Sequence, residues 1–150
     1  MLYPTLNKVE ELLKEYQMVP VFYEVLADYM TPIRMFQALR KEGTPCFMLE
    51  SVENKDQWGR YSFIGINPKS EIKISGKELE VDGVKQEKKL KMSYLSDLIK
   101  KYKSPVMEDY PKLTGGLIGY FGYDMIRQVE KKLTNVPEDD LKMPECHLCM

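Results

Sequence analysis

The chain has 150 residues, of which 43% are hydrophobic, with 22 basic and 23 acidic side chains. This size suits one domain over residues 1–150, and the balanced charge argues against a nucleic-acid or anionic-membrane partner. No apolar run approaches the ~18–20 residues of a membrane span, and an odd number of cysteines favours a reducing, cytoplasmic setting.

The chain opens with a pattern that predicts two helices around a strand. Residues 7–17 carry apolar side chains at the i, i+3, i+4, i+7 spacing of an amphipathic helix. Residues 19–27 are rich in β-branched and aromatic types, which is typical of a strand. Thr31 as N-cap, Pro32 at the first helical position and Gly43 as the stop predict a second helix.

Strands dominate the middle of the chain. Residues 45–52 and 59–68 each predict a strand, and residues 70–76 alternate isoleucine with polar residues, which predicts one wet face. Asp82 and Gly83 separate two short runs and are a strong hairpin signal.

Residues 93–103 predict a helix capped by Ser93, and the glycine-rich run 115–124 predicts a strand. Asp124 is expected to cap a last helix. The strands are not each followed by a helix, so the fold class is α+β, mostly antiparallel sheet with flanking helices.

Two motifs invite a chemical interpretation. Gly116, Gly119 and Gly122 lie inside a strand-like run without the helix that a phosphate-binding loop requires, so close backbone packing is expected. "CHLC", Cys146 to Cys149, resembles half of a zinc or redox motif, but no second half and no βαβ context accompany it. We interpret it as structural, and we assign no catalytic and no metal-binding residue in this chain.

"CFMLESVE", residues 46–53, places polar side chains inside an apolar strand that we expect to be covered on both faces. Alternation puts Leu49 and Ser51 on one face and Glu50 on the other. A buried carboxylate needs a cation. Either Arg60 on the next strand or the ammonium group of a ligand meets that need.

Three blocks of sequence carry a family resemblance. "VPVFYEVLADYMTPIRMFQAL", "FMLESVENKDQWGRYSFIGINP" and "LTGGLIGYFGYDMIRQVEKKL" closely resemble the N-terminal region of the large subunit of anthranilate synthase. The resemblance implies the N-terminal part of that subunit's fold, truncated before the C-terminal chorismate-binding part.

The resemblance also implies a function for the complete protein. Members of the family convert chorismate and ammonia to anthranilate and pyruvate, with Mg²⁺ held by residues of the C-terminal part. A glutamine amidotransferase subunit supplies the ammonia, and L-tryptophan inhibits by feedback. The family's "L-E-S" segment maps onto Leu49, Glu50 and Ser51 as one side of the tryptophan site, and the chain alone is expected to be inactive.

Two alternatives stay open. Aminodeoxychorismate synthase large subunits share a weaker version of the pattern, and a stand-alone amino-acid-binding module would use the same Glu-Ser pair. Because the family folds this region together with its C-terminal part, the chain by itself is expected to expose apolar surface and to self-associate.

Overall fold

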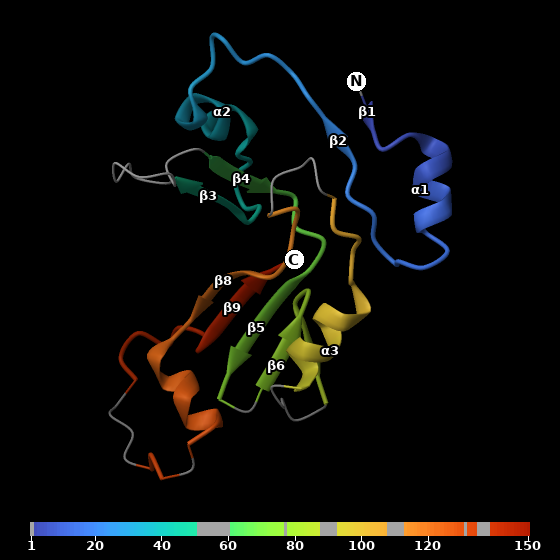
Figure 1. Ribbon diagram of the computed structural model, residues 1–150. Coiled ribbons are helices and arrows are strands. Elements are labelled where there is room, and N and C mark those ends of the chain that lie inside the picture. Colours follow the sequence, from blue (N-terminus) through green and yellow to red (C-terminus); the bar gives the residue numbers. More distant parts are fainter. Residues whose placement is uncertain are drawn as a thin grey trace, which may run out of the picture. The chain divides into compact units, whose positions relative to one another are not determined.

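The computed structural model describes residues 2–50, 61–76, 78–87, 93–107, 113–130, 132–134 and 139–150 (Figure 1). The chain divides into two compact units, one formed by residues 1–24 with 70–150 and the other by residues 25–69. Both are built from antiparallel strands with a few helices, which confirms the predicted α+β class. No helix in the described part of the chain is long and apolar enough to cross a bilayer.

The first unit begins with a short strand pair around a helix. β1 (Leu2–Tyr3) pairs antiparallel with β2 (Phe22–Tyr23), and α1 (Leu6–Leu12) lies between them in the chain. The predicted helix is therefore present but shorter. The predicted strand 19–27 is reduced to Phe22–Tyr23, because its pairing partner β1 is equally short.

A five-stranded antiparallel sheet in the order β7-β6-β5-β9-β8 is the largest element of this unit (Figure 1). Its strands are β5 (Glu71–Ser75), β6 (Glu78–Val81), β7 (Val84–Gln86), β8 (Ile118–Phe121) and β9 (Cys146–Cys149). β9 comes from the far end of the sequence and lies between β5 and β8. Sequence patterns predict the first four of these strands in chain order, but they did not predict β9, and its insertion is decided by long-range pairing.

The core lies on one face of the sheet. Ile72 and Ile74 of β5 are 0% exposed, and they pack with Leu148 of β9 and Leu95 of α3 (Ser93–Lys101). The alternate residues of β5 and β9 are only partly covered. The predicted wet face of residues 70–76 is thus confirmed.

The Asp82-Gly83 hairpin forms as predicted between β6 and β7. Both residues have positive φ, 53° and 79°, as a type I′ turn requires. The Asp82 carboxylate accepts a hydrogen bond from the Glu71 amide at 2.8 Å and from the Ser70 hydroxyl at 3.1 Å. The turn residue therefore also fixes the start of β5.

Glycine in β8 allows close packing, as the sequence predicts. A Cβ on Gly119 would lie 2.0 Å from the backbone oxygen of His147 on β9. The predicted helix after β8 is instead a 3₁₀ helix, η1 (Tyr123–Gln128), whose N-cap is Gly122. The cap assigned to Asp124 is wrong, because Asp124 already lies in the first turn, where it pairs with Arg127 at 2.7 Å.

The second unit holds α2 (Pro32–Leu39), β3 (Cys46–Glu50) and β4 (Ser62–Ile66). The Thr31 hydroxyl accepts a hydrogen bond from the Arg34 amide at 3.3 Å, which confirms the predicted N-cap. Gly43 is not the helix stop, because Arg40 already adopts extended backbone. With φ of 73°, Gly43 serves the following turn, in which the Thr44 amide bonds to the Lys41 carbonyl.

Candidate functional site

The predicted ligand segment lies at the end of the β3–β4 hairpin. Leu49 is paired with Phe63 and Glu50 with Ser62. Glu50 is the last residue of β3, and Ser51 and Arg60 lie outside the described residues. The structure therefore places two of the three predicted site residues, and the proposed Glu50–Arg60 pairing stays a prediction.

An apolar surface accompanies Leu49 on its face of the hairpin. Residues directly opposite each other in a ladder share a face, so Leu49 lies beside Phe63. The Tyr61 and Phe63 rings have centroids 6.0 Å apart. Leu49 is 47% exposed and Tyr61 is 50% exposed, so this surface is open to an apolar group.

Glycine opposite Phe47 shapes the same face. A Cβ on Gly65 would lie 1.9 Å from the Phe47 ring, so the ring lies directly across the glycine. The face therefore continues as an aromatic and aliphatic strip of Phe47, Leu49, Phe63 and Tyr61. The sequence analysis did not single out Tyr61 and Phe63. Their i, i+2 spacing places both side chains on one face of a strand, and this spacing would have indicated them if the pairing with β3 had been considered.

Glu50 differs from Leu49 in its surroundings. Alternation turns its carboxylate to the opposite face, and the residue is exposed. The expectation of a strand covered on both faces is wrong at this end of β3, because both Leu49 and Glu50 are exposed within the chain. A ligand contacting both side chains would have to reach around the end of the strand.

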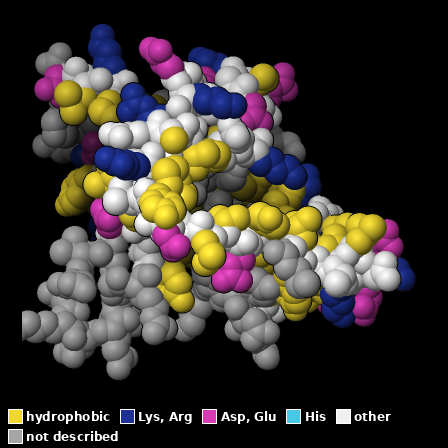
Figure 2. All heavy atoms as spheres, turned by 90° about the horizontal axis from the view of Figure 1, so that it is seen from above, with side chains coloured by type: hydrophobic (Ala, Val, Ile, Leu, Met, Phe, Trp, Pro, Cys, Tyr) yellow, Lys and Arg dark blue, Asp and Glu magenta, His cyan; other side chains and the backbone are white. Residues whose placement is uncertain are grey.

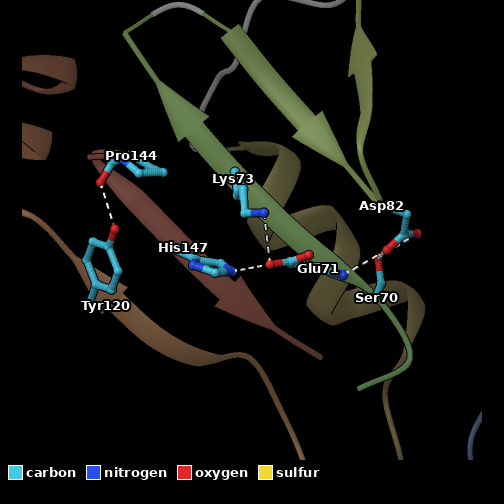
Figure 3. A network of polar contacts seen from close by, with 7 residues as sticks. All are labelled: Ser70, Glu71, Lys73, Asp82, Tyr120, Pro144 and His147. Carbon is cyan, nitrogen blue, oxygen red and sulfur yellow. Dashed lines mark hydrogen bonds and ion pairs between the residues drawn. The ribbon is translucent and has the colours of Figure 1, made fainter. Parts of the chain in front are cut away.

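A second polar constellation lies on the sheet of the other unit (Figure 3). Glu71 Oε1 lies 2.6 Å from His147 Nε2 and 3.0 Å from Lys73 Nζ. The Tyr120 hydroxyl donates to the Pro144 carbonyl at 3.0 Å, and the Tyr120 ring meets the His147 ring edge-on. The sequence did not reveal this cluster, because it depends on the register that sets β9 beside β5 and β8.

Electrostatics indicate a structural role for this cluster. Lys73, together with His147, lowers the pKa of the Glu71 carboxyl, and Glu71 in turn raises the pKa of Lys73. The Glu71 carboxylate is thus held charged by Lys73 of its own strand and by a hydrogen bond with the His147 imidazole of β9. Because Glu71 of β5 contacts His147 of β9, it helps to hold these two strands together. With its lowered pKa, this carboxyl is poorly suited to act as a general base.

The two cysteines of "CHLC" do not converge. Cys146 is buried in the core, whereas Cys149, three residues further along the strand, lies on the opposite face. Burial raises the pKa of the Cys146 thiol to about 11 and also raises that of Cys149, so both resist ionisation. This geometry agrees with the structural interpretation of the motif.

Comparison with known proteins finds relatives of one kind. Anthranilate synthase component 1 of Acetivibrio thermocellus is 42% identical over 157 aligned positions, which cover 98% of this chain and 30% of that protein. The chain is thus similar, over nearly its whole length, to a part of anthranilate synthase component 1. The same component of Acinetobacter calcoaceticus is 36% identical over 133 positions, 83% of this chain and 27% of that protein. No protein-family model matches the chain.

The anthranilate synthase component 1 relatives are much longer than this chain, which spans about 30% of the Acetivibrio thermocellus protein. A solved structure, anthranilate synthase component I from Streptococcus pneumoniae TIGR4, matches 85% of this chain and 27% of that one. Its TM-score is 0.47 at 24% identity. The predicted resemblance is confirmed by the sequence relatives.

Proposed function

We propose that the full-length protein containing this chain is component 1 of a cytoplasmic anthranilate synthase, and that this chain is a regulatory and scaffolding part of it. The observation that carries the proposal is 42% identity to such a component over 98% of the chain. The proposed reaction converts chorismate and ammonia to anthranilate and pyruvate. A glutamine amidotransferase subunit is the proposed source of the ammonia.

The chemistry of this reaction is assigned to the part of the polypeptide outside this sequence. In the described residues, no group of three His, Cys, Asp or Glu side chains could hold a metal ion. Mg²⁺ and chorismate are therefore proposed to bind elsewhere in the full-length protein. This chain contributes one side of the L-tryptophan site.

The β3–β4 hairpin supports that contribution. The open strip of Leu49, Phe63 and Tyr61 offers apolar contact to an indole ring. Alternation predicts that the Ser51 hydroxyl follows Leu49 on the same face, and Glu50 provides a carboxylate for the ammonium group. Inhibition then follows if tryptophan binds one arrangement of the full-length protein better than another.

Tryptophan titration of the full-length enzyme tests the proposal. Anthranilate formation is followed for the wild type, for Ser51→Ala and for the control Ser96→Ala, whose side chain is exposed on α3. We expect Ser51→Ala to raise the inhibitory tryptophan concentration roughly tenfold or more, since it loses a hydrogen bond to a charged ligand. Its uninhibited rate should stay near the wild-type rate, and Ser96→Ala should change neither quantity.

Two results would contradict the proposal at different levels. Unchanged inhibition in Ser51→Ala would remove the site assignment and leave the enzymatic assignment intact. Formation of the 4-amino product in place of anthranilate would assign the full-length protein to the aminodeoxychorismate branch.

A further inference from the structure

The apolar strip of the β3–β4 hairpin is built in rows that cross the two strands. Residues that pair directly across a ladder share a face. Leu49 pairs with Phe63 in one row, and the next row on this face pairs Phe47 with Gly65. Neighbouring rows are roughly 7 Å apart, because each residue advances a strand by about 3.3–3.4 Å. Alternation predicts Ser51 beyond Leu49, so the strip has a polar end and an apolar end.

The row at the apolar end holds one side chain that spans both strands. A Cβ on Gly65 would overlap Cε1, Cζ and Cδ1 of the Phe47 ring. The ring therefore occupies the place that a side chain at position 65 would take. Aromatic rings cover cross-strand glycines in this way in other sheets. Phe47 thus closes the full width of the strip at this end.

Exposure changes along the strip in the same direction. Leu49 is 47% exposed and Tyr61 is 50% exposed, whereas Phe47 is partly covered. The open part of the strip therefore lies between the Phe47 ring and the polar end. An amino acid whose charged groups bind at Glu50 and Ser51 lays its side chain over this open part. Since one row spans roughly 7 Å, the far edge of an indole ring comes up against Phe47.

We propose that the Phe47 ring, held across Gly65, is the end wall of the L-tryptophan site and sets the largest side chain that the site accepts. This inference rests on the tryptophan site of the proposed function and adds a selectivity residue to it. Phe47 contacts the benzo edge of the indole ring. Gly65 is a positioning residue, because it leaves free the space in which the Phe47 ring lies. Tryptophans with a substituent on the benzo edge are disfavoured by the same wall.

Binding of a longer tryptophan analogue to the full-length protein tests the end wall. Calorimetry gives the dissociation constants of L-tryptophan and of L-5-methoxytryptophan, whose added group extends the benzo edge. Phe47→Leu withdraws the side chain from Gly65, and we expect the preference for L-tryptophan over the analogue to fall roughly tenfold or more. Met48→Leu is the matched control, because Met48 is the next residue of β3 and lies on the opposite face. It should leave the preference unchanged.

A second set of variants tests the positioning role of Gly65. Gly65→Ala puts a Cβ into the space of the Phe47 ring and turns the ring out of its place. We expect L-tryptophan to bind roughly tenfold more weakly as a result. The double variant Gly65→Ala/Phe47→Leu should bind it more tightly than Gly65→Ala alone, since leucine lacks the outer ring atoms that the added methyl meets. Independent, additive losses in the double variant overturn the positioning role.

Ser51→Ala, measured in the same way, separates this proposal from the proposed function. If Ser51→Ala weakens tryptophan binding while Phe47→Leu leaves the preference unchanged, the end wall is wrong and the tryptophan site stands. If Ser51→Ala leaves tryptophan binding unchanged, the site and its end wall both fall. An equal loss of preference in Met48→Leu and Phe47→Leu also overturns the end wall, because it would reflect a general loosening of the hairpin.

Discussion

The five-stranded sheet and the β3–β4 hairpin use similar apolar alternation and reach different degrees of burial. In the sheet, Ile72, Ile74 and Cys146 are 0% exposed beneath α3 and η1. In the unit of residues 25–69, no described residue is buried, and Leu49 is 47% exposed. An apolar strand face becomes a core when a second layer covers it.

Many apolar side chains of the chain are exposed on its surface. Figure 2 shows many of them as yellow spheres among charged side chains on the face that it views. Leu26 and Tyr29, on the segment before α2, are 91% and 94% exposed. Such exposure is typical of surfaces that bind another polypeptide, and it agrees with the expectation of self-association for the isolated chain.

Truncation of a core side chain should give the largest effect and break the sheet. Ile74→Ala removes a fully buried side chain, and we expect a loss of about 2–5 kcal/mol in the free energy of unfolding. Leu49→Ala, the matched change in the hairpin, should cost less than about 1 kcal/mol because the side chain is already half exposed. Urea denaturation of both variants measures the difference. Equal losses would show that the hairpin contributes a core of its own.

Two glycine substitutions should give an intermediate effect. Gly119→Ala would place a Cβ 2.0 Å from a backbone oxygen of β9, which can yield only if the strands separate. We expect a loss of about 1–3 kcal/mol. Gly65→Ala meets the Phe47 ring, a side chain that can rotate, so its loss should be smaller. The same denaturation experiment ranks the two variants, and the reverse order would contradict this account of the packing.

Acid titration of stability should give the smallest effect and sharpen the role of Glu71. Its pKa is lowered in the folded sheet by Lys73 and His147. The resulting stabilisation is present above the unfolded pKa of roughly 4.3 and is lost as pH falls through the folded pKa. Glu71→Gln should therefore be less stable than the wild type near neutral pH, by less than about 1 kcal/mol because the cluster is partly solvated.

The control for this titration is Glu50→Gln, which removes one exposed carboxylate from the hairpin. The stability difference between wild type and Glu71→Gln should shrink as the pH falls below roughly 4.3 and should vanish below the lowered folded pKa, where both states bind the proton. A difference that persists unchanged at low pH would mean that the Glu71 side chain acts through packing and not through charge.

Local signals predicted much of this fold correctly. The Thr31 N-cap, the Asp82-Gly83 turn and the wet face of β5 all form as expected. Each depends on a few neighbouring residues, whose side-chain bonds or positive φ act over one turn. The errors at Gly43 and Asp124 concern helix ends, where the path of the following chain decides which residue turns.

The candidate site was likewise predicted only in part. The sequence predicted Leu49, Glu50 and Ser51 through their resemblance to a family motif. It did not reveal Phe63 and Tyr61 beside Leu49, because their contribution depends on the register of β3 against β4. The Glu71–His147 contact was missed for a similar reason, since 76 positions separate its residues in the sequence.

By itself, the sequence determined the family resemblance, the α+β class and the local turns and caps, since these follow from residue types at short spacing. Only the tertiary structure decided that β9 lies between β5 and β8, that Cys146 joins the core while Cys149 does not, and that β8 ends the sheet with an uncharged edge. The physical reason is that strand order and register are set by pairing between distant segments. A local pattern can show that a strand has two faces, but the partner decides which face is buried.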